Sequence, residues 1–343
     1  MYKSIYVHIP FCKMICTYCD FKREINSDEN IEKYIDKIIL EINEVKHILK
    51  TIYIGGGTPN ILNDKLLDKF LNSLNKNIDK NTEVTIELNP ELITKSQLLI
   101  LKSNNVNRIS LGVQSTNNNI LKELGRLHTI EIVNDKIALL KKYNFENISC
   151  DFIYNLPNMK LSDVDDMLLF IKKNDIKHLS FYSLEIKEGS RLNKLKYKID
   201  NEKEEEFLFY FQNKINLNRY EISNWSKNEN YESKHNKAYW NMEGWKGIGY
   251  GACGFDDNTY TESKGKTSDW KYTYEKISIE ELYKDILIMG LRQVRGINLN
   301  EEKNSQAFEF YKNSIPKNLI IIENNYLRVK EIDLLNEVLL NII

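Results

Sequence analysis

The stretch at residues 6–21, YVHIPFCKMICTYCDF, carries the strongest signal in this chain of 343 residues. It places Cys12, Cys16 and Cys19 in a CxxxCxxC spacing. Three thiolates on one loop can bind three irons of a 4Fe-4S cube and leave the fourth iron open, whereas a set of four cysteines would close the cluster. The motif therefore predicts an iron–sulfur site whose open iron takes an exchangeable ligand.

A zinc site is the main alternative for these cysteines. Zinc prefers four protein ligands, commonly supplied by CxxC pairs, and the sequence has no second pair. Buried thiols without a metal are a further alternative. The other two cysteines, Cys150 and Cys253, stand alone, and we expect each to be a small core residue.

Composition narrows the class of protein. The chain has 48 Lys and Arg against 49 Asp and Glu, a formal net charge of -1, so we do not expect nucleic acid as a partner. Its length suffices for one large domain and a small one. Five cysteines without a signal peptide argue against a disulfide framework and favour a cytoplasmic protein. No apolar run approaches the roughly 20 residues that span a bilayer.

Strand-like and helix-like segments alternate through the first half of the chain. Ile31, Ile35, Ile38 and Ile42 recur at helical spacing after the first of six apolar, β-branched runs. These runs are IYVHI, TIYIGG, VTIEL, RISLGVQ, CDFIYN and HLSFYSL. Six successive βα units predict an α/β fold, with a parallel sheet, helices outside it and ligands at the carboxyl ends of the strands.

The alternation stops after Leu184, and we divide the chain into three parts. Residues 1–234 are expected to form the core domain. Residues 235–266, which begin with HNKAYW, are expected to connect it to a small α+β module at residues 267–343. A helical segment, a hairpin-like IIIENNYLRV and a last helix make up that module.

An ordered set of short motifs extends the signal from Tyr6 almost to the end of the chain. They are YVHIPFC, GGGTP, ELNP, NRISLGVQS, LGRLH, CDFIYNLP, YEISNW, HNKAYW and GLR. Together they resemble the oxygen-independent coproporphyrinogen III oxidase-like family of radical S-adenosylmethionine (SAM) proteins, and within it the heme chaperone branch called HemW. The resemblance implies a partial (β/α)6 TIM-like radical SAM barrel, with the amino and carboxylate groups of SAM on the open iron.

The resemblance also implies which residues contact SAM. The loop GGGTP at residues 55–59 would hydrogen-bond its amino group, and Arg126 would bind its carboxylate through two parallel bonds. Asp151, at the tip of the fifth strand, would hold the ribose diol. The full set implied to contact SAM or the cluster is Tyr6, Gly56, Gly57, Thr58, Glu87, Gln114, Arg126 and Asp151. Taken alone, these residues also fit structural roles, such as a glycine turn, a salt-bridged strand end or a core tyrosine.

HNKAYW matches a signature that the heme chaperone branch associates with heme. His235 would then be an axial ligand of the iron, and Tyr239 and Trp240 would offer apolar faces to the porphyrin. A lone histidine among aromatic residues is otherwise a hydrogen-bonded structural residue. A departure from the family occurs at Asn155, which stands where a glycine is usual.

Two features favour the chaperone branch over the oxidase. Phe21 stands where the oxidase has a further cysteine, and the sequence starts directly at the first strand. The resemblance therefore implies a protein that binds heme and delivers it to an acceptor protein, served by a reducing electron donor, with membrane contact only through the acceptor. The alternatives are oxidative decarboxylation of porphyrinogen propionates and a SAM-binding protein without a tetrapyrrole.

Overall fold

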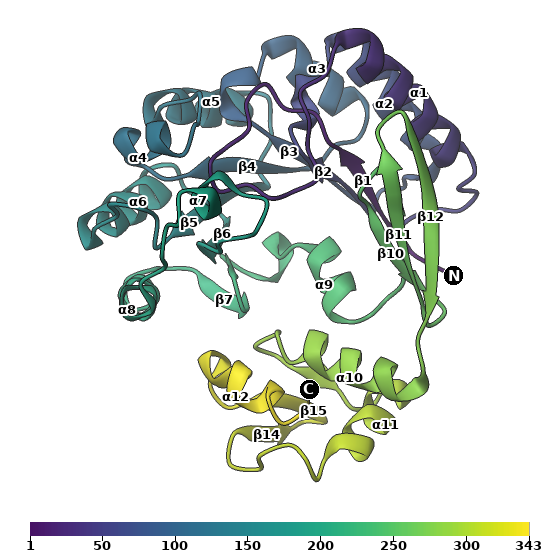
Figure 1. Ribbon diagram of the computed structural model, residues 1–343, viewed down its shortest axis with the longest axis vertical. Coiled ribbons are helices and arrows are strands. Elements are labelled where there is room, and N and C mark those ends of the chain that lie inside the picture. Colours follow the sequence, from purple (N-terminus) through teal and green to yellow (C-terminus); the bar gives the residue numbers. More distant parts are fainter. Residues whose placement is uncertain (343) are drawn as a thin grey trace.

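The computed structural model describes residues 1–342 and shows a strongly curved sheet with helices on its outer side (Figure 1). Six parallel strands form the middle of the sheet. They are β1 (Ser4–Ile9), β2 (Thr51–Gly56), β3 (Glu83–Leu88), β4 (Arg108–Gln114), β5 (Ile148–Tyr154) and β6 (His178–Ser183). The helices between them are α1 (Asp28–Asn43), α2 (Asp64–Leu74), α3 (Lys95–Ser103), α4 (Asn118–Glu123), α5 (Ile130–Lys142) and α6 (Leu161–Lys173). The predicted α/β class is confirmed.

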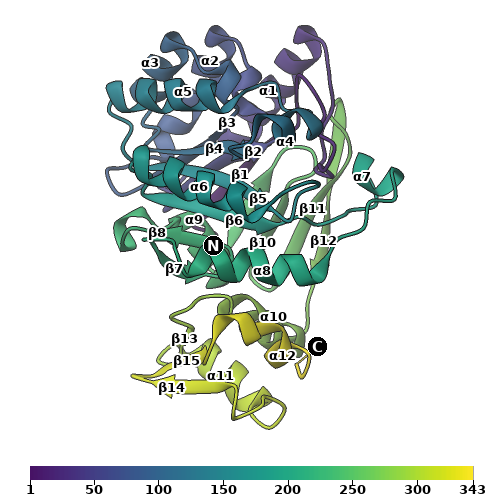
Figure 2. The same ribbon diagram turned by 90° about the vertical axis from the view of Figure 1, so that its left-hand side faces the viewer.

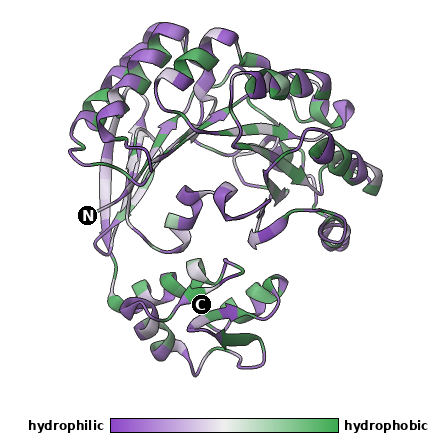
Figure 3. Cartoon of the chain, turned by 180° about the vertical axis from the view of Figure 1, so that it is seen from behind, coloured by the Kyte–Doolittle hydropathy of each residue, from purple (hydrophilic) through white to green (hydrophobic). Residues whose placement is uncertain are grey.

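The outer helices follow the apolar spacing of the sequence. On α1 the buried residues include Ile31, Ile35, Ile38 and Ile42, as predicted. Figure 3 shows that these helices carry both hydrophilic and hydrophobic residues, as expected for elements with one buried face. Within the described residues, no helix is both long enough and apolar enough to cross a membrane.

Strand β4 shows how the sheet obtains a polar inner face. Ile109, Leu111 and Val113 are fully buried in the main hydrophobic core, whereas Arg108 and Ser110 line a cavity on the concave side. Successive side chains of a strand point to opposite faces. The alternation of apolar and polar residues therefore separates the core from a polar interior, which we call the lumen.

Further strands extend both edges of the sheet. On the β6 side lie α7 (Arg191–Lys194), α8 (Asn201–Gln212), β7 (Asn218–Glu221) and β8 (Asn224–Ser226). On the β1 side lie α9 (Lys234–Trp240), β9 (Trp245–Ile248), β10 (Cys253–Asp256), β11 (Thr259–Lys266) and β12 (Asp269–Lys276). The sheet has twelve strands in the order β12-β11-β10-β9-β1-β2-β3-β4-β5-β6-β8-β7. The helix α9 lies inside the curve of the sheet (Figure 1).

The domain boundary expected at residue 267 differs from the structure. That position falls in the turn between β11 and β12, which pair in antiparallel register as part of the large sheet. Trp270 of β12 is buried in the main core, and its indole N–H donates to Glu41 on α1 at 2.9 Å. Residues 235–276 are therefore sheet edge and inner helix rather than a connecting segment, and the module starts after β12.

The C-terminal module packs beneath the open side of the curved sheet (Figure 2). It contains α10 (Ile279–Gly290), β13 (Ile297–Asn298), α11 (Glu302–Tyr311), β14 (Ile320–Glu323), β15 (Tyr326–Val329) and α12 (Leu335–Leu339). Ser278 and Glu281 form a capping box that starts α10. The second hydrophobic core joins residues of the module such as Leu282 and Leu287 to Trp245 and Phe255 of the large sheet.

Candidate functional site

A single cavity of about 1480 Å³ occupies the concave side of the sheet. The three cysteines of the loop after β1 all line it, and so do residues of the lumen such as Asp151. The wall continues to the C-terminal module, where Arg292 and Asp333 contribute. The structure thus connects the predicted metal loop, the carboxyl ends of the strands and the module in one continuous space.

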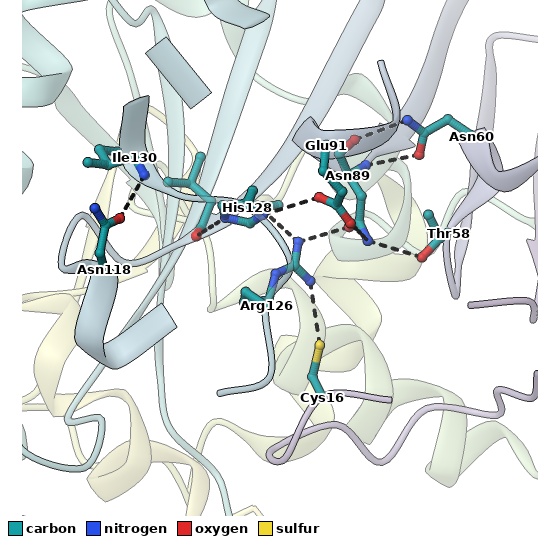
Figure 4. Close-up of polar contacts among 11 residues, drawn as sticks. Cys16, Thr58, Asn60, Asn89, Glu91, Asn118, Arg126, His128 and Ile130 are labelled. Carbon is teal, nitrogen blue, oxygen red and sulfur yellow. Dashed lines mark hydrogen bonds and ion pairs between the residues drawn. The ribbon is translucent and has the colours of Figure 1, made fainter. Parts of the chain in front are cut away.

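Two of the cysteine sulfur atoms have hydrogen-bond donors. Thr58 Oγ1 lies 3.6 Å from Cys12 Sγ, and Arg126 Nη1 lies 3.6 Å from Cys16 Sγ (Figure 4). Within residues 1–342, no three His, Cys, Asp or Glu side chains lie close enough to hold one metal ion. A 4Fe-4S cube requires a different arrangement, because each thiolate binds its own iron.

Burial affects the ionisation of the cysteines on this loop. Burial raises the pKa of Cys12 and raises the pKa of Cys19 to about 11. Both thiols are therefore protonated near neutral pH, and a metal that coordinated them would deprotonate them. Donors to sulfur, such as Thr58 and Arg126, tune the reduction potential of such clusters.

The glycine loop packs directly against the cysteine segment. A Cβ atom on Gly57 would lie 2.7 Å from the carbonyl oxygen of Phe11, and one on Gly55 would lie 2.7 Å from the carboxyl of Glu87. Gly56 has φ +116°, a conformation that other residues rarely adopt. Backbone contact at Gly57 and the backbone angle at Gly56 therefore require glycine, whereas a side chain at position 55 would displace the Glu87 carboxyl; the loop brings β2, Glu87 and the cysteine loop together.

Glu87 faces the cavity from the end of β3, as predicted. Its carboxylate accepts from the backbone N–H of Gly56 at 3.0 Å and from the Tyr53 hydroxyl at 2.9 Å. Burial raises the pKa of Glu87 to about 7, and the negative charge of Asp151 acts in the same direction. A carboxylate has four lone-pair sites, so Glu87 keeps acceptor capacity for a ligand in the cavity.

Arg126 joins the cysteine loop to the end of β4. Its Nη2 donates to Asn89 Oδ1 and to the carbonyl oxygen of Gly112, both at 2.9 Å. Its Nε is buried without a hydrogen-bond partner, which a bound ligand could supply. Asn89 also donates to Thr58 Oγ1 at 3.3 Å, so it links the donors of two cysteines (Figure 4).

Asn89 and the pair formed by Glu91 and His128 also belong to this site, although the sequence did not single them out. His128 Nδ1 lies 3.3 Å from Glu91 Oε2. Although burial acts in the opposite direction, this contact lowers the pKa of Glu91. The motif ELNP contains Asn89 and is followed directly by Glu91, and LGRLH contains His128 two residues after Arg126, so their place in and next to these motifs was the available signal.

Two further residues of the predicted SAM set, Gln114 and Asp151, line the cavity. Gln114 lines the cavity at the end of β4 with φ +69°, a left-handed conformation uncommon for this residue. Asp151 lies in the middle of β5 rather than at its tip, and it accepts from the hydroxyls of Ser110 and Ser180, both at 2.8 Å, and of Ser149 at 3.3 Å.

Tyr6 lies outside the cavity wall rather than beside the cysteines. Its hydroxyl contacts His8 Nδ1 at 2.9 Å, and His8 Nε2 contacts the carbonyl oxygen of Lys22 on the cysteine loop at 2.8 Å. Tyr6 therefore supports the loop through His8.

His235, the expected axial ligand of heme, is buried and is not among the residues that line the cavity. The imidazole is 1% exposed and stacks on Tyr53. Its Nδ1 lies 2.7 Å from Thr51 Oγ1, and its Nε2 lies 2.8 Å from the Tyr239 hydroxyl. An axial ligand needs a free ring nitrogen that faces a cavity, and here both nitrogens are engaged. Burial lowers the pKa of His235 to about 3, so the ring is neutral.

The HNKAYW segment forms α9, which closes the bottom of the lumen. Glu83 at the start of β3 accepts from the backbone N–H groups of Lys234 at 3.2 Å and His235 at 3.1 Å. Asn236 lines the cavity, whereas Trp240 lies within 5.5 Å of the Arg292 guanidinium. In this structure the histidine of the motif therefore anchors the inner helix α9, as expected for a hydrogen-bonded structural residue.

Three further expectations concern single residues. Cys150 is fully buried, as expected, but Cys253 is exposed at the start of β10 and is not a core residue. Asn155 has φ +59°, which explains why glycine is usual there, and its side chain donates to the carbonyl oxygen of Asp200 at 3.0 Å.

Comparisons with known proteins agree with this geometry. The family model of the Radical SAM superfamily matches residues 6–171. The heme chaperone HemW of Lactococcus lactis subsp. lactis (strain IL1403) is 33% identical over 328 residues, which cover 90% of this chain and 86% of that protein. HemW of Bacillus subtilis (strain 168) is 31% identical over 347 residues, which cover 92% of this chain and 91% of that protein.

A solved structure shows the same fold. Coproporphyrinogen III oxidase (HemN) from Escherichia coli, described as a radical SAM enzyme, superposes with a TM-score of 0.81 at 17% identity and covers 99% of this chain and 89% of its own. That likeness extends over the curved sheet and the C-terminal module alike. Because the HemW relatives match along nearly the whole chain, this protein belongs to the HemW family of heme chaperones within the radical SAM superfamily.

Proposed function

We propose that the protein carries a 4Fe-4S cluster on Cys12, Cys16 and Cys19, binds SAM at the open iron, and binds heme in the same cavity for delivery to an acceptor protein. The observation that carries this proposal is the continuity of the cavity from the three cysteines to the C-terminal module. The relatives that match most of the chain are named heme chaperones.

The residues around the cysteines fit SAM. The unpartnered Nε of Arg126 and the acceptor capacity of Glu87 suit the carboxylate and amino groups of the ligand. Gln114 and Asp151 line the same space and would position the nucleoside. When bound and reduced, the cluster could supply an electron to the sulfonium of SAM, with a reducing electron donor as its source. Five free cysteines suit the reducing conditions of the cytoplasm, where we place the protein.

The rest of the cavity is large enough for a tetrapyrrole beside SAM. Its volume of about 1480 Å³ exceeds the roughly 300 to 1,000 Å³ of a typical small-molecule pocket. Met14, Phe21 and Phe209 line it and are 46%, 63% and 71% exposed, so apolar surface is available to a porphyrin face. Near the module the wall is polar: Arg292 lines it, and Arg219 is paired with Asp333 at 2.6 Å.

Incubation of the anaerobically reconstituted protein separates the two candidate functions. We expect heme to remain bound at about one per chain after gel filtration, and coproporphyrinogen to stay unconverted in the presence of SAM and a reductant. Oxidation of coproporphyrinogen is the competing function, because the fold is that of HemN. Accumulation of protoporphyrinogen without heme uptake would overturn the proposal in favour of an oxidase.

SAM binding is expected to depend on pH through Glu87. The pKa of about 7 means that the carboxyl is ionised above pH 7 and protonated below it. A protonated carboxyl is a poorer acceptor for the amino group of SAM, so affinity should fall about tenfold from pH 8 to pH 6. Equilibrium binding to Glu87→Gln is the control, because that variant retains only the titration of SAM itself. Equal pH profiles for both proteins would show that Glu87 does not contact SAM.

A further inference from the structure

An arginine that is not among the residues assigned to the cluster or SAM lies buried in the lumen, at the start of β4. Arg108 is the first residue of β4, is 2% exposed, and lines the cavity. It shares the inner face of the strand with Ser110 and Gly112. Buried charges in proteins are normally paired, because an isolated ion in a low-dielectric interior is strongly destabilising.

Within the described residues, Arg108 has no carboxylate among its hydrogen-bond partners, although the negative charge of Asp151 lies close enough to interact with it. Its Nη2 lies 3.2 Å from His178 Nδ1, which also contacts Ser149 Oγ at 2.8 Å. Burial lowers the pKa of His178 well below its ordinary value, so this ring is neutral. The Nε of Arg108 is buried without a hydrogen-bond partner. In the part of the chain that the structure describes, no carboxylate forms an ion pair with this guanidinium.

The nearby carboxylate in the lumen is already satisfied by other groups. Asp151 accepts from the hydroxyls of Ser110, Ser149 and Ser180. Its negative charge makes the lumen less positive, but it leaves the hydrogen-bonding sites of Arg108 unfilled. The cavity can therefore bring an anionic group to Arg108 that the chain itself does not provide.

Such an anion is distinct from the carboxylate of SAM. Arg126, the residue assigned to that carboxylate, donates to the carbonyl oxygen of Gly112. Gly112 lies four residues along β4 from Arg108, or roughly 13 Å at about 3.3 Å per residue. The two arginines therefore lie at opposite ends of the strand, one at the cysteine loop and one at the start of β4.

We propose that Arg108 binds a carboxylate of the tetrapyrrole, a propionate side chain that reaches into the lumen. This inference rests on the proposed function. The planar guanidinium matches a carboxylate through two parallel hydrogen bonds, and Nε is one of the donors left for it. The macrocycle then lies toward the apolar side chains of the cavity, such as Phe209. Arg108 would thus favour a porphyrin whose propionates are ionised over one whose propionates are esterified.

Titration with two porphyrins tests this role. The probes are iron protoporphyrin IX and its dimethyl ester, added to the anaerobically reconstituted protein and followed by absorbance. The wild type is expected to bind the diacid about ten- to a hundredfold more tightly than the ester, the range for a charge-assisted hydrogen bond. In Arg108→Gln the affinity for the diacid should fall to that for the ester, whose binding should not change. The conservative Arg108→Lys should keep part of the preference for the diacid, because lysine retains the positive charge but lacks the planar guanidinium that can form two parallel hydrogen bonds.

Arg191→Gln is the matched control, because Arg191 is an exposed arginine at the start of α7, and it should behave as the wild type. A diacid preference that survives in Arg108→Gln would overturn the inference and leave the proposed function intact. Equal loss of both porphyrins would assign Arg108 a structural role instead. Equal affinity of the wild type for both porphyrins would also overturn the inference, independently of any variant. Failure of the wild type to bind either porphyrin would overturn the proposed function as well.

Discussion

Cys16→Ser is expected to reduce the iron content of the anaerobically reconstituted protein from about four per chain to near zero. Cys16 lies on the loop that lines the cavity and accepts a hydrogen bond from Arg126. Serine at this position offers a hydroxyl that does not ionise as a thiol does, so one iron of the cube loses its ligand. Iron analysis and the visible absorption of the cluster measure the effect.

Cys253→Ser serves as the control for this experiment. Cys253 is a free, exposed cysteine on β10, outside the cavity wall, so its loss should leave the iron content unchanged. Stable iron in Cys16→Ser, or tight zinc without iron in the wild type, would contradict the assignment of the loop to a 4Fe-4S cluster.

His235→Ala is expected to lower the free energy of unfolding by about 3 to 4 kcal/mol. The substitution removes a buried ring that stacks on Tyr53 and leaves the hydroxyls of Thr51 and Tyr239 without their partners. Because the imidazole anchors α9 rather than facing the cavity, the heme spectrum of the folded variant should match that of the wild type. Urea denaturation followed by circular dichroism measures the loss.

His47→Ala is a useful comparison, because that ring is only partly buried and has one hydrogen bond, to the carbonyl oxygen of Tyr2 at 2.9 Å. We expect it to lose at most about 1 kcal/mol. Full stability of His235→Ala together with an altered heme spectrum would restore the histidine as a ligand of the iron.

The features that sequence predicts well here are local ones. The CxxxCxxC loop identifies its own chemistry, because all three ligands lie within eight residues of one another. The six strands are apolar runs with clear ends, and every one of them is found in the parallel part of the sheet. Glu87 and Arg126 were assigned to SAM mainly through the motifs ELNP and LGRLH of the family resemblance, and both line the cavity.

Features that depend on distant partners were not predictable. The hydrogen bond of His235 Nδ1 depends on Thr51, which lies 184 residues away, so the motif alone cannot separate a ligand from an anchor. Arg108 belongs to a quoted motif, NRISLGVQS, but its lack of a carboxylate among its hydrogen-bond partners is visible only once His178 is placed beside it. The module boundary was misplaced because β12 is mostly exposed and polar, DWKYTYEK, with Trp270 as its one buried residue.

Equilibrium loading of the reconstituted protein with SAM and heme together tests the central claim that one cavity holds the cluster and both ligands. After gel filtration, the bound iron, SAM and heme are counted for each chain. We expect about four cluster irons, one SAM and one heme, with heme uptake unaffected by saturating SAM. Heme that displaces SAM, or protein that retains the cluster and SAM but takes up no heme, would contradict the account.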